Sequence, residues 1–186
     1  MNLYVVAWAQ TMTVLDNVMY VVYMGSNTIK TYTADTFEPL GRDIHGEEMY
    51  EPISMVACRD DRQLYVADSH YTIFRVSADD QSYVKWLTPQ VPIDDYEGTP
   101  LGFFTLSVTP GRLVVTSPNP PALHQYSTAD KQLLRDVPLP SCVKKLKHGV
   151  ETSRGTFVIA YSGGDSWEDD AVSKRLYFCH LLLAPT

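Results

Sequence analysis

The side chains best suited to chemistry in this chain are carboxylates, and they gather in a few short segments. Half of the 22 acidic residues fall in segments that contain neither Lys nor Arg. A surface rim of one charge sign concentrates electrostatic potential and attracts cationic partners. These segments predict either a binding surface for a basic partner or a solvated face that keeps the domain soluble. They are Glu47, Glu48, Glu51, Asp68, Asp94, Asp95, Glu97, Asp165, Glu168, Asp169 and Asp170.

Aromatic residues lie in the same segments, at Tyr50, Tyr71, Tyr96 and Trp167. Large aromatic side chains are frequent anchors at protein interfaces, although they also cover the ends of a hydrophobic core. Together with the carboxylates they predict a surface for a protein or peptide partner, with a basic partner as one option. The predicted partner-binding residues are Glu47, Glu48, Tyr71, Asp94, Asp95, Tyr96, Trp167, Asp169 and Asp170.

Residue patterns for catalysis are missing from the sequence. The five histidines are dispersed and none has a His-x-x-x-His partner for a metal. There is no Gly-x-Ser-x-Gly nucleophile motif and no phosphate-binding glycine loop with a lysine. The three cysteines show no Cys-x-x-Cys spacing, and an odd number is no disulfide framework, although one bridge stays open. We therefore expect no catalytic residues and no cofactor.

Charge and hydropathy exclude two further classes of partner. The net charge of −7 and the scattering of only 15 Lys and Arg residues disfavour a nucleic-acid surface, which requires clustered cations. No apolar stretch reaches the roughly 20 residues that a membrane-spanning helix needs. The short apolar start, Leu3–Ala9, follows only Met1 and Asn2, so a strand is favoured over a secretory signal. The expected location is the cytoplasm.

The strands that support these loops recur four times along the chain. Similar apolar strands occur at Met19–Tyr23, Leu64–Asp68, Leu113–Ser117 and Thr156–Ala160, so the repeat period lies in the forties. The first three copies are each followed by a second alternating run that ends in an Ala-Asp pair, at Asp35, Asp79 and Asp130. A period of this length made of short strands is typical of β-propeller blades.

The repeats predict an all-β fold: a β-propeller of about four four-stranded antiparallel blades in a single domain, residues 1–186. The blades are expected at about 11–44, 53–87, 103–137 and 145–181, and the first blade ends with a strand at Glu38–Ile44. The fourth copy lacks a last strand, which the N-terminal strand at 3–8 would supply, closing the ring and removing an exposed edge. The alternative is an open arc of a larger, six-bladed propeller. A closed ring predicts a monomer, whereas an arc makes a dimer possible.

The segment Leu64–Val76 resembles an NHL-type or YVTN-type propeller repeat. Its Leu-Tyr-Val-Ala-Asp strand is followed by a turn and by the Ile-Phe-Arg-Val strand typical of those repeats. The sequence departs from NHL repeats at Asp60-Asp61, in place of Asp-Gly, and at His70-Tyr71, in place of Gly-Asn. The resemblance therefore implies the fold more strongly than a function. RNA binding, as in some NHL-like domains, is disfavoured by the acidic charge.

Two functions follow from this resemblance and from the residues. The main prediction is a non-catalytic binding or scaffolding module that contacts a protein or peptide through its acidic loops. The alternative comes from lactonases of related propeller type, which hold Ca²⁺ in the central channel with Glu, Asn and Asp. That resemblance implies a Ca²⁺ site at Asn27, Asp68 and Asn119 in this chain.

Overall fold

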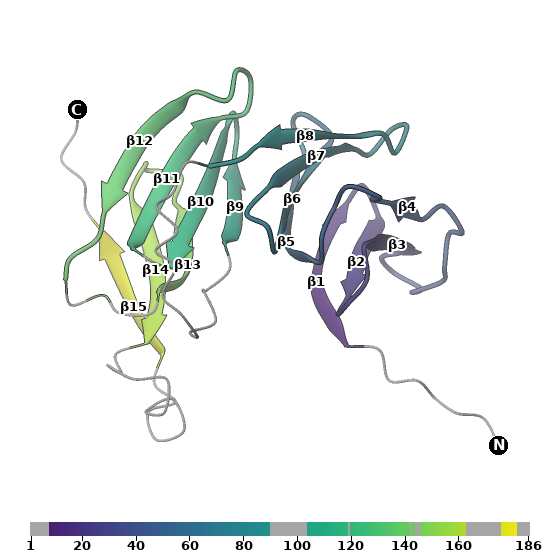
Figure 1. Ribbon diagram of the computed structural model, residues 1–186, viewed down its shortest axis with the longest axis horizontal. Helices are drawn as coiled ribbons and strands as arrows, with labels where there is room; N and C mark the ends of the chain where they lie inside the picture. The colour runs from purple at the N-terminus through teal and green to yellow at the C-terminus, as the bar shows by residue number, and fades with distance from the viewer. Residues whose placement is uncertain are drawn as a thin grey trace. The chain divides into compact units, whose positions relative to one another are not determined.

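The computed structural model describes residues 8–89, 104–118, 120–141, 143, 146–162 and 176–181. The chain divides into two compact units, Met1–Thr88 and Pro89–Thr186, and each contains two sheets (Figure 1). All the regular elements of the described residues are strands, which confirms the predicted all-β class. Within that part of the chain, no helix has the length and apolar character needed to cross a membrane.

The first sheet is an antiparallel meander in which each strand pairs with the next one along the chain. Tyr20 and Val22 on its second strand and Ile29 on its third belong to the core of the unit, and Val21, on the opposite side of the second strand, is buried as well. On the third strand of the sheet, buried Ile29 and Thr31 alternate with the partly exposed Lys30, as period-two patterning predicts. Its strands are β1 (Ala9–Leu15), β2 (Val18–Tyr23), β3 (Thr28–Thr33) and β4 (Ile44–His45).

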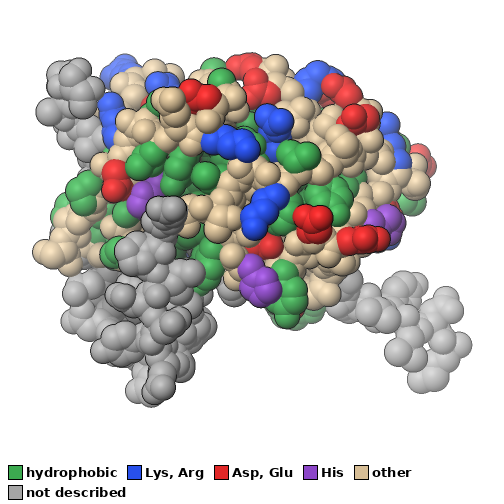
Figure 2. Space-filling view, turned by 45° about the horizontal axis from the view of Figure 1, so that its top comes forward, with side chains coloured by type: hydrophobic (Ala, Val, Ile, Leu, Met, Phe, Trp, Pro, Cys, Tyr) green, Lys and Arg blue, Asp and Glu red, His purple; other side chains and the backbone are tan. Residues whose placement is uncertain are grey.

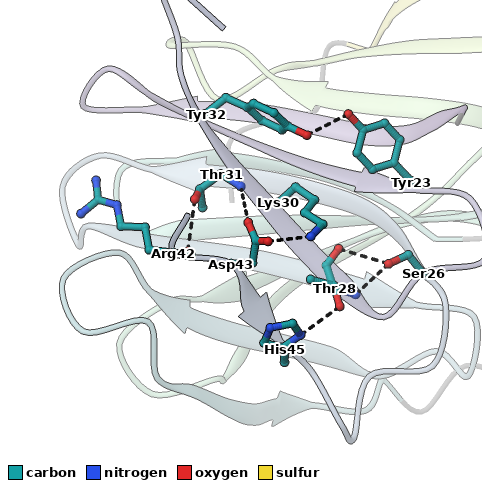
Figure 3. Close-up of polar contacts among 9 residues, drawn as sticks. All are labelled: Tyr23, Ser26, Thr28, Lys30, Thr31, Tyr32, Arg42, Asp43 and His45. Carbon is teal, nitrogen blue, oxygen red and sulfur yellow. Dashed lines mark hydrogen bonds and ion pairs between the residues drawn. The ribbon is translucent and has the colours of Figure 1, made fainter. Parts of the chain in front are cut away.

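The fourth strand of this sheet is much shorter than the predicted Glu38–Ile44. Only Ile44–His45 forms a strand, preceded by one isolated bridge between Tyr32 and Pro39. Pro39 has no N–H to donate, and Gly41 turns the chain with a φ of 67°. The N–H of Thr31 on β3 donates instead to a side chain, because Oδ1 of Asp43 accepts its hydrogen bond at 3.2 Å (Figure 3).

The second sheet completes the first unit and is a full four-stranded meander. Leu64 and Val66 on its second strand join one core with Tyr20 and Val22 of the first sheet. The two sheets also meet along their first strands, where the N–H of Met55 donates to Thr11 Oγ1 at 3.1 Å. The strands are β5 (Pro52–Cys58), β6 (Gln63–Asp68), β7 (Ile73–Ser77) and β8 (Tyr83–Leu87).

The second unit repeats this arrangement with one four-stranded and one three-stranded sheet. Their shared core contains Val114, Leu123, Phe157 and Ile159, all fully buried. The four-stranded sheet has β9 (Thr105–Thr109), β10 (Arg112–Pro118), β11 (Pro121–Ser127) and β12 (Leu133–Pro138). The three-stranded sheet has β13 (Leu146–Glu151), β14 (Phe157–Ser162) and β15 (Leu176–Leu181).

The predicted closing strand at 3–8 falls almost entirely outside the described residues. The last sheet has the order β13-β14-β15 in the part of the chain that the structure describes. Ring closure, and with it the choice between a closed ring and an arc, therefore stays a prediction.

One backbone hydrogen bond recurs in three of the four sheets and shows that the sequence repeat is structural. In each sheet the turn after the third strand donates an N–H to the turn between the first two strands. The bonds join Ala34 N to Asn17 O (2.9 Å), Ala78 N to Arg62 O (3.1 Å) and Thr128 N to Gly111 O (3.0 Å). All three acceptor residues have positive φ, and only one is glycine.

The Ala-Asp pairs all lie in the turns after the third strands, as the sequence predicts, but one is offset. Phe37, Gln81 and Lys131 occupy equivalent positive-φ positions, so Asp130 corresponds to Asp80 rather than to Asp79. Oδ1 of Asp80 accepts hydrogen bonds from the N–H and hydroxyl of Ser82, and these bonds lower its pKa. Aspartate thus caps local N–H groups in these turns.

Candidate functional site

Three loops of the first unit meet at one end of its two sheets. They are residues 24–27, between β2 and β3, residues 46–51, between β4 and β5, and residues 69–72, between β6 and β7. Backbone hydrogen bonds join them, because Gly46 N donates to Asn27 O at 3.1 Å and Ser69 N donates to Tyr50 O at 3.0 Å. We call this continuous surface, formed by 24–27, 46–51 and 69–72, the loop face.

Asp68 fixes two of these loops to each other. Its side chain lies at the end of β6, and the residue is only 2% exposed. Oδ1 accepts hydrogen bonds from the N–H groups of His70 (3.0 Å) and Thr72 (2.8 Å), and Oδ2 accepts one from the N–H of Tyr50 (3.2 Å). A buried carboxylate with three N–H donors is well compensated, and such charged hydrogen bonds are stronger than neutral ones.

This arrangement brings two aromatic rings together on the surface. The rings of Tyr50 and His70 are parallel, with centroids 4.1 Å apart and an interplanar angle of 3°. Tyr50 is 54% exposed, and His70 is exposed as well. Asp68 accepts an N–H from each of these two residues, so one buried side chain positions both rings.

The loop that carries Tyr50, residues 46–51, also contains three glutamates. Met49 is 2% exposed and belongs to the core of the first unit, so it anchors the middle of the loop. Glu47, Glu48 and Glu51 lie on either side of it and are exposed. None of the three loops contains a Lys or Arg, so the loop face has a negative charge.

The turns at the other end of these sheets have mixed charge. Arg62 forms ion pairs with Asp16 and with Asp79, whose Oδ1 lies 2.9 Å from Nε. All three side chains are substantially exposed, and exposed ion pairs of this kind contribute little stability. On the face shown in Figure 2, Lys and Arg side chains are interspersed with Asp and Glu, in agreement with the scattered cations of the sequence.

A polar cluster on the first sheet has a structural role (Figure 3). Lys30 Nζ lies 2.6 Å from Asp43 Oδ2. Burial acts to raise the pKa of Asp43, but the hydrogen bonds from Lys30 and Thr31 outweigh it and lower the pKa. On the same sheet the hydroxyls of Tyr23 and Tyr32 lie 3.1 Å apart, and this bond is the main reason that the pKa of Tyr32 rises to about 12. The contacts of Asp43 hold the segment just before β4 against β3, and the Tyr23–Tyr32 bond joins β2 to β3.

The structure brings together three of the predicted partner-binding residues. Glu47, Glu48 and Tyr71 all lie on the loop face. Tyr71 is partly buried, which raises the pKa of its hydroxyl. The remaining predicted partner-binding residues lie outside the described residues: Asp94, Asp95, Tyr96, Trp167, Asp169 and Asp170.

Sequence reasoning did not place His70 in this site. Tyr50 and His70 are 20 positions apart, and the stack depends on the pairing of Pro52 with Asp68 across β5 and β6. The only signal available in the sequence was Asp68 itself, because a carboxylate at the end of a buried strand needs donors from neighbouring loops.

Asp68, one of the residues of the Ca²⁺ alternative, has other partners for its carboxylate in the structure. Both carboxylate oxygens of Asp68 accept backbone N–H groups, and the backbone oxygen of Asn27 accepts the N–H of Gly46. Asn119 lies outside the described residues. Among the residues that the structure describes, no three His, Cys, Asp or Glu side chains group as a metal site would require.

The second unit contains a buried carboxylate of its own. The side chain of Glu151 is 2% exposed, and its Oε2 accepts hydrogen bonds from Thr109 Oγ1 at 3.0 Å and Gln125 Nε2 at 2.7 Å. Arg112 Nε lies 3.2 Å from the same oxygen. The two hydrogen-bond donors come from β9 and β11, the ion-pair partner Arg112 from β10 and the carboxylate from β13, so this network joins two neighbouring sheets.

Comparison with known proteins identifies the class of fold. No protein-family model and no curated protein match the chain by sequence. Among solved structures it is similar to the Swd1 β-propeller domain of Myceliophteria thermophila, with a TM-score of 0.61, 9% identity, and coverage of 83% of this chain and 49% of that one. It is also similar to the RRP9 WD40 repeats, with a TM-score of 0.63, 12% identity, and coverage of 84% and 46%.

A computationally designed protein, Ika4, matches over almost its whole length. Its TM-score is 0.61 at 13% identity, with coverage of 95% of this chain and 92% of that one. The chain spans about half the length of the Swd1 and RRP9 structures. The fold is therefore a β-propeller fold built of antiparallel blades, which confirms the predicted class. The NHL or YVTN type of repeat stays a prediction, since the matching natural domains include WD40 repeats.

Proposed function

We propose that this protein is a non-catalytic binding module that holds a basic protein or peptide segment on its loop face. The observation that carries the proposal is the exposure of Glu47, Glu48 and Glu51 on loops that contain no cation and are joined by backbone hydrogen bonds. Carboxylates attract a cationic partner. Because the scaffold that carries them is rigid, few groups become ordered when the partner binds, and the entropic cost of binding is low.

The fold supports a function located in the loops. Propellers host many unrelated functions on the same blades, so the activity depends on the connecting segments. Besides Glu47, Glu48 and Tyr71, we propose that the corresponding acidic segments of the second unit take part. Their residues are Asp94, Asp95, Tyr96, Trp167, Asp169 and Asp170.

Charge reversal tests the proposal. The probe is a fluorescein-labelled peptide of alternating Gly, Lys and Arg, with binding followed by fluorescence anisotropy at low and high NaCl. The double variant Glu47→Lys/Glu48→Lys should bind about tenfold more weakly, since two exposed charge pairs contribute roughly 1.4 kcal/mol in total. Asp169→Lys/Asp170→Lys tests the second unit in the same way.

The matched control reverses two exposed charges in turns at the other end of the first unit, Glu38→Lys/Asp60→Lys. This control changes the net charge by the same amount, but at a distance from the loop face. It should therefore lower the affinity for the peptide much less. Equal losses in the two double variants, or no loss in Glu47→Lys/Glu48→Lys, would leave solubility as the only role of the glutamates.

A further inference from the structure

The stacked rings of Tyr50 and His70 lie exposed to solvent on the loop face. An apolar ring gains more by packing into a core than by lying half in water, and 54% of Tyr50 is exposed. In a parallel stack with centroids 4.1 Å apart, each ring covers one face of the other. The outer ring faces and the edges are what the pair presents to a partner.

The backbone that carries the pair is held in place within the protein itself. Asp68 is 2% exposed and accepts N–H groups from both Tyr50 and His70. The Ser69 side chain also donates to the backbone oxygen of Tyr50, at 3.0 Å. Binding at such a surface immobilises few additional groups, so little of the interaction free energy is lost to ordering.

The chemistry of the pair together with the loop selects a particular kind of ligand group. The negative face of an aromatic ring attracts cations, and a planar guanidinium can also stack on it. Glu47, Glu48 and Glu51 belong to the same six-residue loop as Tyr50. A guanidinium forms paired hydrogen bonds with a carboxylate, whereas a lysine ammonium acts as a compact point charge.

We propose that the Tyr50–His70 stack and the glutamates of the 46–51 loop form an arginine-recognition site. In this site a partner's guanidinium stacks on the exposed face of the ring pair and bonds a neighbouring carboxylate. The inference rests on the proposed function, which it refines by naming the recognised group and the two rings that select it.

The experiment compares three hexapeptides of identical length that alternate Gly with Arg, Lys or citrulline. Citrulline keeps the planar shape of arginine but has no charge. Each peptide is titrated into the full chain by isothermal titration calorimetry, in wild type and in the variants Tyr50→Leu and His70→Ala. For the wild type we expect the Arg peptide to bind most tightly, the Lys peptide less tightly and the citrulline peptide most weakly.

Replacing a ring should weaken binding of the Arg peptide by about two- to fivefold per stacked arginine, since an exposed cation–π contact contributes about 0.5–1 kcal/mol. Binding of the Lys peptide should change less, which reduces the preference for Arg. Phe37→Leu is the matched control, because Phe37 is 65% exposed and lies in a turn outside the loop face. Circular dichroism verifies that each variant is folded, and His70→Ala provides an independent test should Tyr50→Leu unfold.

The outcomes separate this inference from the proposed function. Peptide binding that depends on Glu47 and Glu48 but is unchanged in Tyr50→Leu and His70→Ala overturns the arginine site and leaves the basic-peptide function standing. Equal affinity of wild type for the Arg and Lys peptides also overturns it. Binding that is insensitive to the glutamates as well as to the rings overturns both.

Discussion

Replacing Asp68 by Asn tests whether one buried carboxylate organises the loop face. The substitution keeps the size of the side chain and removes its charge. In the wild type, Oδ1 of Asp68 accepts hydrogen bonds from the N–H groups of His70 and Thr72. An Asn whose side-chain oxygen preserves these two bonds must turn its side-chain NH₂ toward the N–H of Tyr50, which then has no acceptor. The opposite orientation is worse, since it places the amide group against two donors.

The expected loss follows from these three contacts. A hydrogen bond to a charged group contributes about 1.5–3 kcal/mol and a neutral one about 0.5–1.5 kcal/mol, so two bonds weaken and the third is lost. Relief of the desolvation cost of the charge offsets part of this. We expect Asp68→Asn to lower the free energy of unfolding by about 2–3 kcal/mol.

The assay is urea unfolding followed by tryptophan emission, with buried Trp86 as the reporter in the same sheet as Asp68. Hydrogen exchange measured by mass spectrometry should show faster exchange in 46–51 and 69–72. The control, Asp60→Asn, removes an equal charge from an exposed turn of that sheet and should leave stability within about 0.5 kcal/mol of wild type. A similarly small effect for Asp68→Asn, with unchanged exchange, would refute the role given to this carboxylate.

Three further predictions concern the second unit. Glu151→Gln turns charged hydrogen bonds into neutral ones and should cost about 1–2 kcal/mol in urea unfolding; a neutral result would mean that the buried network contributes no net stability. Gly149→Ala places a Cβ 2.4 Å from Leu123 Cδ2 and should cost about 1–3 kcal/mol, part of which Leu123→Val restores; no restoration would contradict the steric cause. Burial lowers the pKa of His124, against the opposing effect of its carboxylate partner, and also lowers that of His148, so both protonate more readily in the unfolded chain. The melting temperature should therefore fall as the pH drops below 6.5, the usual histidine value, and His124→Asn/His148→Asn should flatten this slope; an unchanged slope would exclude these histidines as its cause.

The strands were readable from the sequence because period-two alternation and local turn residues specify them. The expected Met19–Tyr23 and Leu64–Asp68 each differ by one residue from the observed β2 and β6. The exception, Glu38–Ile44, contains Pro39 and Gly41, and both argue against a continuous strand.

The loop site was only partly predictable. Composition alone identified Glu47 and Glu48, because a run of carboxylates without cations is visible in the sequence. The pairing of Tyr50 with His70 was not visible, since it depends on the register of β5 and β6 and on the N–H groups that Asp68 accepts. Contacts set by register between distant segments are tertiary information that single-sequence patterns do not contain.

Mapping where an arginine peptide binds tests the arginine-recognition site on the loop face most directly. The ¹⁵N-labelled chain is titrated with the Gly-Arg hexapeptide and its amide signals are followed by NMR. We expect saturable shifts concentrated in residues 46–51 and 69–72, with the signals of the Arg62 turn unchanged. Shifts centred on the Arg62 turn, or no saturable shifts at all, would contradict it.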